Sequence, residues 1–250
     1  MIIIWDNELD KYNLIVSSEQ GNFPASGLQN IHLVNSWRSN SLLDQYIKID
    51  AGVGNTITAD CAVIAAHNLT SGATIKIQGN DTDAWGGPPT LNETITYNAD
   101  IMTKLFTSAA LRFWRFFFDD PANTDGYIEV GRLSFGPRLQ MPPVASGFDI
   151  PKKTTSNRNI SITGQSYGDV GYKYRSPGFS FPFISDSEKA AIEAMWEEVD
   201  RIKPVFLLIW EDSLDIVGPI YCLIDQDELS WKRDADNRTW ILEINFLEVF

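Results

Sequence analysis

The sequence predicts a mainly β protein in which an N-terminal jelly-roll β-sandwich is followed by an α+β domain. Three observations predict this fold class. Short alternating segments separated by turn residues fill the stretch from Tyr46 to Pro137. Aromatic residues make up 12% of the 250 residues and hydrophobic residues 44%, which favours β-sheets with substantial cores. A single segment, residues 186–202, has clear helical periodicity.

The first domain is assigned to residues 1–138 from its run of strands. Apolar and polar residues alternate within the strands, and Gly, Asn, Asp and Pro lie between them. Such spacing without a helical period is typical of a β-sandwich or jelly roll. The strands are expected at residues 2–5, 46–49, 56–64, 74–78, 93–97, 111–118 and 127–135.

A proline-rich segment separates the two halves of the chain. PRLQMPPVASGFDIP, residues 137–151, holds four prolines and one glycine. That composition favours an extended connection over a helix or a sheet. We therefore expect a linker at 139–151 and a second domain at 152–250.

The second domain is predicted to consist of β-sheets covered by one helix. Ser185 and Glu188 form a capping box that begins the helix, and Pro204 prevents it from continuing. The apolar residues of the helix recur at helical spacing at 192, 195, 196, 199 and 202. Strands are expected at 158–164, 179–183, 205–210, 217–224, 228–233 and 239–249, with a hairpin loop at 234–237.

The charge of the chain argues against nucleic acid as a partner. There are 33 acidic and 20 basic residues, and the net charge is −13, whereas each phosphate contact requires a Lys or Arg. The charge is also uneven, with five basic and two acidic residues in 141–180 but six basic and 16 acidic residues in 181–250. The two segments could pair within the chain or across a subunit contact, or the acidic surface could be solvated.

Cysteine content and hydropathy indicate where the chain is made. Cys61 and Cys222 both lie in apolar β-like runs, so we expect free buried thiols in preference to a disulfide. The N-terminus MIIIWDNELD lacks the basic region and the long apolar core of a signal peptide. No stretch is long enough to insert into a membrane. We expect synthesis in the cytoplasm without a signal peptide.

No catalytic constellation is found in the sequence. The two histidines, His32 and His67, have no second ligand three or four residues away, and a hydrogen-bonded turn histidine is the expected role of His67. There is no nucleophile elbow and no phosphate-binding loop. The chain is therefore expected not to be an enzyme and to carry no resident cofactor.

One loop carries the candidate ligand-binding residues, which are Asn80, Asp81, Asp83 and Trp85. The segment NDTDAWGGPP is expected to expose the Trp85 ring, which could stack on a sugar while Asp or Asn accepts its hydroxyls, or could form a subunit contact. The loop carboxylates also suit calcium, although the twelve-residue calcium pattern is missing. A solvated loop is the remaining alternative.

Four segments within about residues 30–138 of the first domain read YIKIDAG, ADCAVIAAHNLTSGATIKIQGN, LRFWRFFFDD and GYIEVGRLSFGP. Together they resemble the discoidin-like (galactose-binding-like) jelly roll of tailed-bacteriophage structural proteins. The second half, with FSFPF, the capped helix and the terminal LEINFLEV, is similar to the tail-tube-like, sheet-plus-helix domain of phage minor tail proteins.

The resemblance implies a non-catalytic structural component of a virion. It places the chain at the distal tail or tail tip, where it would form a homo-oligomeric ring or an adaptor that contacts neighbouring tail proteins. The jelly roll would then project as a side domain. An alternative function is that of a glycan-binding module, which attaches to the host surface through the jelly-roll loops.

Overall fold

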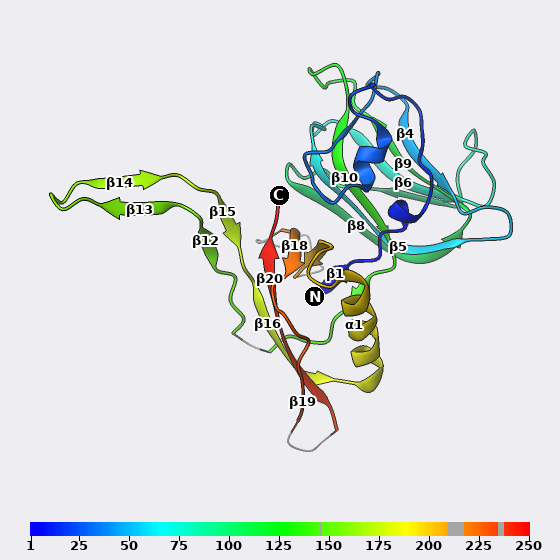
Figure 1. Ribbon diagram of the computed structural model, residues 1–250. Helices are drawn as coiled ribbons and strands as arrows, with labels where there is room; N and C mark the ends of the chain where they lie inside the picture. The colour runs from blue at the N-terminus through cyan, green and yellow to red at the C-terminus, as the bar shows by residue number, and fades with distance from the viewer. Residues whose placement is uncertain (146, 210–217, 235–237) are drawn as a thin grey trace. The chain divides into compact units, whose positions relative to one another are not determined.

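The computed structural model describes residues 1–145, 147–209, 218–234 and 238–250 (Figure 1). These residues form a mainly β protein, as predicted, with one α-helix among them. The chain divides into two compact units. The sandwich unit comprises Ile2–Leu139 with Leu208–Pro219 and Phe250, and the helical unit comprises Met1, Gln140–Leu207 and Ile220–Val249. The division into domains 1–138 and 152–250 with a linker at 139–151 stays a prediction.

The sandwich unit contains two antiparallel sheets with a jelly-roll-like arrangement. One sheet has four strands in the order β3-β10-β5-β8, and the other has five in the order β2-β4-β9-β6-β7. β5 and β9 are central strands, each paired on both sides. The strands are β2 (Ile15–Val16), β3 (Trp37–Arg38), β4 (Gln45–Asp50), β5 (Ile57–His67), β6 (Thr74–Asn80), β7 (Leu91–Thr94), β8 (Ile101–Leu111), β9 (Phe113–Asp119) and β10 (Glu129–Gly136).

Alternation along β9 explains which residues fill the core of the sandwich unit. Trp114, Phe116 and Phe118 are almost fully buried, whereas Arg115 between them is only partly buried. The Trp114 ring lies 5.5 Å from that of Phe135 on β10. A fully buried aromatic side chain contributes about 2–3 kcal/mol of hydrophobic free energy. Because this cluster combines residues of both sheets, it holds the two sheets together.

One long strand, β8, was not predicted. A strand is predicted at 93–97, and the structure has β7 at Leu91–Thr94 and then β8 at Ile101–Leu111. Lys104 is two residues from the buried Met102 and Phe106, so it shares their face of β8, where it pairs with Glu93 at 3.0 Å. A charged residue on the buried face weakens the alternation that identifies a half-buried strand.

In the helical unit, four strands pair in the order β17-β18-β20-β16, and β19 also pairs with β20. These pairings are antiparallel. Trp210 and Val217 at the ends of two predicted strands, and residues 235–237 of the predicted hairpin loop, lie outside the described residues. The strands are β16 (Gly178–Ile184), β17 (Val205–Leu208), β18 (Ile220–Ile224), β19 (Trp231–Arg233) and β20 (Trp240–Glu248).

The predicted helix is confirmed as α1 (Asp186–Val199), with a different end. The capping box is present, because the Ser185 hydroxyl accepts from the Glu188 N–H and the Glu188 carboxylate accepts from the Ser185 N–H. The helix ends three residues earlier than predicted, since Asp200 has a positive φ of 49°. Ile202, expected on the buried face, is consequently 68% exposed.

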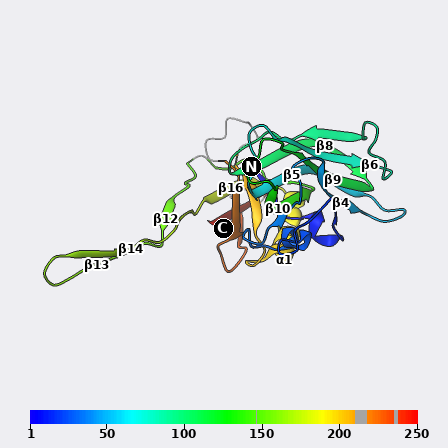
Figure 2. The ribbon, with the colours of Figure 1, turned by 90° about the horizontal axis from the view of Figure 1, so that it is seen from above.

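Two further antiparallel strand pairs of the helical unit form a narrow ribbon (Figures 1 and 2). β12 (Lys152–Thr154) pairs with β15 (Lys173–Arg175), and β13 (Asn157–Ile160) pairs with β14 (Ser166–Asp169). We call residues 152–175 the arm. Only its 158–164 portion was predicted as a strand.

The remaining elements are short. Among the described residues, no helix is both long and apolar enough to span a membrane. The short elements are β1 (Ile2–Ile4), β11 (Leu139–Gln140) and the 3₁₀ helices η1 (Glu8–Lys11) and η2 (Ala25–Gln29).

Candidate binding site

The structure brings the predicted loop residues together at the end of β6. Asn80 closes the base of the loop, because its side-chain amide donates to the Ala84 carbonyl (2.8 Å) and its side-chain oxygen accepts from the Asp81 N–H (3.0 Å) and the Thr90 hydroxyl (3.1 Å). Asp81 itself is exposed. Asn80 therefore shapes the loop, which leaves the carboxylates and the indole as its groups for contact with a ligand.

Trp85 is more constrained than the sequence suggested. It was expected to be exposed, but it is partly buried. The Arg115 guanidinium lies over its ring at 4.1 Å from the centroid, and its indole N–H donates to Asp83 Oδ1 at 2.7 Å. A cation over an indole face is a favourable contact, which explains why the loop folds back onto the sheet.

The loop is anchored by side chains that sequence reasoning did not assign to a site. Lys48 Nζ lies 2.5 Å from Asp83 Oδ2, and Arg115 Nε donates to Gln78 Oε1 at 2.7 Å. Lys48 on β4 and Gln78 on β6 are both register partners of Arg115 on the central strand β9. We call these three residues the polar row. The available signal in the sequence was a polar residue at an alternate position of each apolar strand, as in YIKID and IKIQ.

A second ion pair involves the end of β4. The Asp50 carboxylate accepts two hydrogen bonds from the Arg112 guanidinium, at 2.7 and 2.8 Å, and one from the Gly52 N–H. The hydrogen bonds from Arg112 lower the pKa of Asp50 to about 2. The hydrogen bond from Lys48 likewise lowers the pKa of Asp83. Both carboxylates are therefore anions at neutral pH.

The two arginines of the RFWRFFF segment have different partners. Arg112 pairs with the Asp50 carboxylate, whereas Arg115 donates to the neutral amide of Gln78 and stacks on Trp85. The Arg115 guanidinium thus contacts one face of the Trp85 ring, a role that the spacing in the sequence did not indicate.

The Asp83 carboxylate has two partners within the chain. Both carboxylate oxygens of Asp83 are engaged, by Lys48 and by Trp85. No group of three or more His, Cys, Asp or Glu side chains able to hold a metal occurs among the described residues. The assignment of Asn80, Asp81, Asp83 and Trp85 as ligand-binding residues stays a prediction.

His67 and the two cysteines are held in structural roles. His67 Nε2 forms a hydrogen bond with the Asn98 carbonyl (3.0 Å), and burial lowers the pKa of its ring. Cys61 and Cys222 are buried free thiols, as the apolar runs predicted. Burial raises the pKa of Cys61 to about 12 and raises that of Cys222 as well, so neither is a thiolate at neutral pH.

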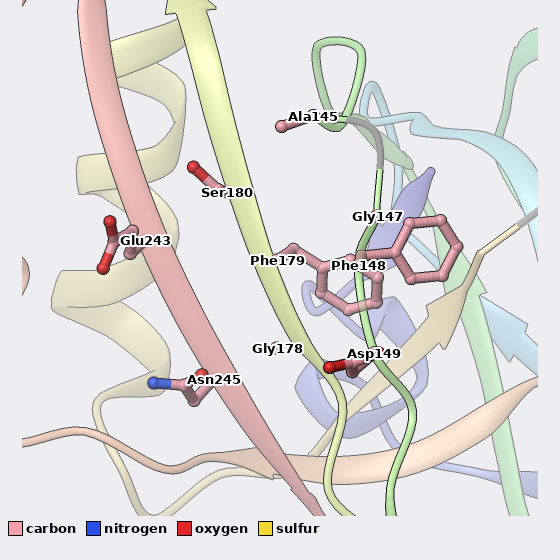
Figure 3. A pocket seen from close by; sticks show the side chains of 9 residues that line it. All are labelled: Ala145, Gly147, Phe148, Asp149, Gly178, Phe179, Ser180, Glu243 and Asn245. Carbon is pink, nitrogen blue, oxygen red and sulfur yellow. The ribbon is translucent and has the colours of Figure 1, made fainter.

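The helical unit contains a separate concavity of about 340 Å³ (Figure 3). Phe148 and Phe179 form its apolar part, with ring centroids 5.3 Å apart, and Asp149, Glu243 and Asn245 provide its polar groups. The predicted site residues do not line it. No sequence motif marks this concavity, because its lining combines Ala145 and residues 147–149 with β16 and β20.

Comparison with known proteins finds likeness at the level of structure. No family model matches the chain, and no curated protein matches its sequence. Solved structures that resemble it include chitosan-binding module 1 of a chitosanase/glucanase from Paenibacillus sp. IK-5, with 19% identity and a TM-score of 0.40. The match covers 52% of this chain and 98% of that module.

Two further similar structures are named as sugar-binding domains. The lectin domain of Lectinolysin, complexed with Lewis B antigen, has 10% identity and a TM-score of 0.42, and the match covers 53% of this chain and 96% of that domain. The family 32 carbohydrate-binding module of NanJ from C. perfringens, in complex with galactose, has 13% identity and a TM-score of 0.41, with coverage of 54% and 98%. Likeness at this level carries no argument about the function of this chain.

Proposed function

We propose that the sandwich unit binds carbohydrate, without catalysis, through Trp85 and Asp83 of the loop that the polar row holds in place. The observation that carries the proposal is the immobilised, partly exposed indole of Trp85. Arg115 supports one face of the ring and Asp83 holds its N–H, so the ring is oriented before any ligand arrives. Such preorganisation reduces the entropy lost on binding.

The chemistry around the ring suits a sugar. A pyranose has a C–H face that packs on an aromatic ring and hydroxyls that both donate and accept hydrogen bonds. Asp83 remains 45% exposed in its side chain although it pairs with Lys48, and Asp81 is exposed beside it. These carboxylates can accept from hydroxyls while the indole contacts the sugar face.

A glycan array followed by calorimetry with the best glycan tests this proposal. Trp85→Ala should raise the dissociation constant at least about tenfold, roughly 1.4 kcal/mol, while Trp85→Phe should retain most of the affinity. Phe183→Ala is the matched control, because Phe183 is a 68% exposed aromatic residue in the other unit. Absence of any glycan binding by the wild-type chain, or equal affinity in Trp85→Ala, would overturn the proposal.

We propose as a second function that the chain is a structural component of a tailed-phage virion at the distal tail or tail tip. The specific observation that favours an assembly role is the arm, since a long exposed ribbon offers surface to other subunits. In this role the chain would form a homo-oligomeric ring or adaptor, contact neighbouring tail proteins, and carry the sandwich unit toward host glycans.

The virion proposal is tested on particles purified from the host lysate. Mass spectrometry should detect the chain in the particles, and gold-labelled antibody should mark the tail tip in electron micrographs. Antibody against a head protein is the control for the labelling position. A chain that stays entirely in the particle-free fraction would exclude the virion role and leave the carbohydrate proposal standing.

A further inference from the structure

The arm exposes apolar side chains to an unusual degree. Ile162 and Val170 are 107% and 97% exposed, and Ile160, Tyr167 and Tyr172 are 59–66% exposed. A two-stranded hairpin without a covering layer is marginally stable in water. An exposed apolar surface of this kind marks a contact with another macromolecule.

The arm is also basic, while the chain as a whole is acidic. Residues 152–175 contain five basic residues and one acidic residue, a net charge of +4, against −10 for residues 181–250. Lys152 and Lys173 are exposed, and no ion pair involves either of them among the described residues. Arg158 donates only to the neutral Ser166 hydroxyl at 2.9 Å. These three cations are free to pair with carboxylates of a partner.

The C-terminal end of α1 has the complementary character. Its last turn contains no basic residue, although Glu197, Glu198 and the cap residue Asp200 are all acidic. Carboxylates at the negative end of a helix dipole are destabilising, and an incoming cation relieves this repulsion. Lys203 pairs with Glu198, which leaves Glu197 and Asp200 exposed beside Ile202.

We propose that the arm of one copy binds the acidic end of α1 of a second copy of this chain. Arg158 and Lys173 would pair with Glu197 and Asp200, and Val170, which lies between these two cations along the arm, would cover Ile202. A second copy is the occupant that the charges favour, because it carries the acidic surface, whereas nucleic acid and anionic membranes would be repelled by the net charge of −13.

The proposed contact joins two different surfaces of the chain, so each copy can bind one neighbour through its arm and another through the end of its α1. Each copy offers one arm and one acidic helix end, and such a heterologous contact produces a closed ring when the rotation between copies closes. The inference rests on the assembly role proposed above and is independent of carbohydrate binding.

Charge reversal with rescue provides the test. Variant A carries Arg158→Glu and Lys173→Glu, and variant B carries Glu197→Lys and Asp200→Lys. Sedimentation velocity should show that the wild type forms oligomers that weaken as salt rises, because the contact is electrostatic. A and B should each sediment as monomers, and an equimolar mixture should assemble again, since both contacts between A and B are then complementary.

Matched controls separate this contact from other effects. Asp100→Lys reverses an exposed charge in the sandwich unit and should leave assembly unchanged. Glycan affinity of A and B should equal that of the wild type, so loss of assembly and loss of carbohydrate binding are distinguished. A monomeric wild type at high concentration, or A and B that assemble alone as well as the wild type, would overturn the inference.

Isotope mixing identifies which chains are in contact. A mixture of ¹⁴N and ¹⁵N chains treated with a zero-length carbodiimide cross-linker should yield mixed-isotope peptides that join Lys152 or Lys173 to Glu197 or Asp200. Cross-links confined to peptides of a single isotope would show that the arm folds onto its own chain, and this result would also overturn the inference.

Discussion

The polar row of the sandwich unit and the arm of the helical unit are both charged surfaces, but their side chains are used differently. In the polar row, Lys48 pairs with Asp83, and Arg115 bonds to Gln78 and stacks on Trp85. In the arm, Lys152 and Lys173 are exposed, and Ile162 and Val170 are 107% and 97% exposed. The polar row is therefore packed within one chain, whereas these arm side chains project into solvent.

The difference follows from what lies beneath each surface. β9 places Arg115 outward while Trp114 and Phe116 on either side of it are buried in the sandwich core. The arm has no layer of buried residues, since nearly all of its side chains are exposed. A preorganised surface on a rigid core suits a small ligand, and an exposed ribbon suits a macromolecular partner.

The largest effect expected from this comparison is on stability. Trp114→Ala should lower the free energy of unfolding of the sandwich unit by about 3–5 kcal/mol, because it removes a fully buried indole from the core. Ile162→Ala in the arm should change it by less than about 0.5 kcal/mol, because Ile162 is fully exposed. Urea unfolding followed by far-ultraviolet circular dichroism measures both.

Equal destabilisation by the two substitutions would contradict the comparison. Phe183→Ala is a useful reference, since Phe183 is 68% exposed in β16 of the helical unit, where the register shifts between Phe181 and Ile184. It should behave like Ile162→Ala. Unfolding curves with two transitions are expected if the units unfold separately, and the Trp114 effect should then appear in one transition only.

Much of the sandwich and of α1 could be predicted from the sequence, for local reasons. YIKID alternates clearly because one face of its sheet is buried and the other is polar, and RFWRFFF indicates a strand through its density of aromatic residues. The start of α1 followed from a capping box, which acts within four residues. β8 escaped prediction because Lys104 interrupts its buried face, and the arm escaped because it has no buried face to impose alternation.

The candidate site was predicted less completely, because its geometry depends on strand register. The loop from Asn80 to Trp85 was identified from its turn residues and its aromatic ring. Lys48, Gln78 and Arg115 are at least 30 residues apart along the chain in every pairing, and only the pairing of β4, β9 and β6 aligns them. The stacking of Trp85 on Arg115 follows from that alignment, and no local pattern in the sequence predicts it.

An intermediate effect is expected at the cap of α1. Ser185→Ala should lower the free energy of unfolding of the helical unit by about 1 kcal/mol, because the Glu188 N–H loses its acceptor at the helix start. Ser185→Asp is the matched control and should retain most of the stability, since Asp also caps helices well. Hydrogen exchange of the first turn of α1 reports the change directly, and unchanged exchange in Ser185→Ala would contradict the role of the cap.

The smallest effect is expected at the Asp50–Arg112 pair, where it depends on pH. Binding to Arg112 lowers the pKa of Asp50 from 3.8 to about 2, so the folded chain holds the proton less tightly than the unfolded chain does. The stabilisation is therefore fully present above pH 4 and is lost as the pH falls from about 4 to 2. Asp50→Asn should cost less than about 1 kcal/mol at pH 7, because the pair is partly exposed, and nothing near pH 2.

Urea unfolding at several pH values measures the difference, with the exposed Asp100→Asn as control. A penalty for Asp50→Asn that stayed constant down to pH 2 would show that Arg112 does not stabilise the ionised carboxylate, and that the ion pair does not stabilise this end of β4.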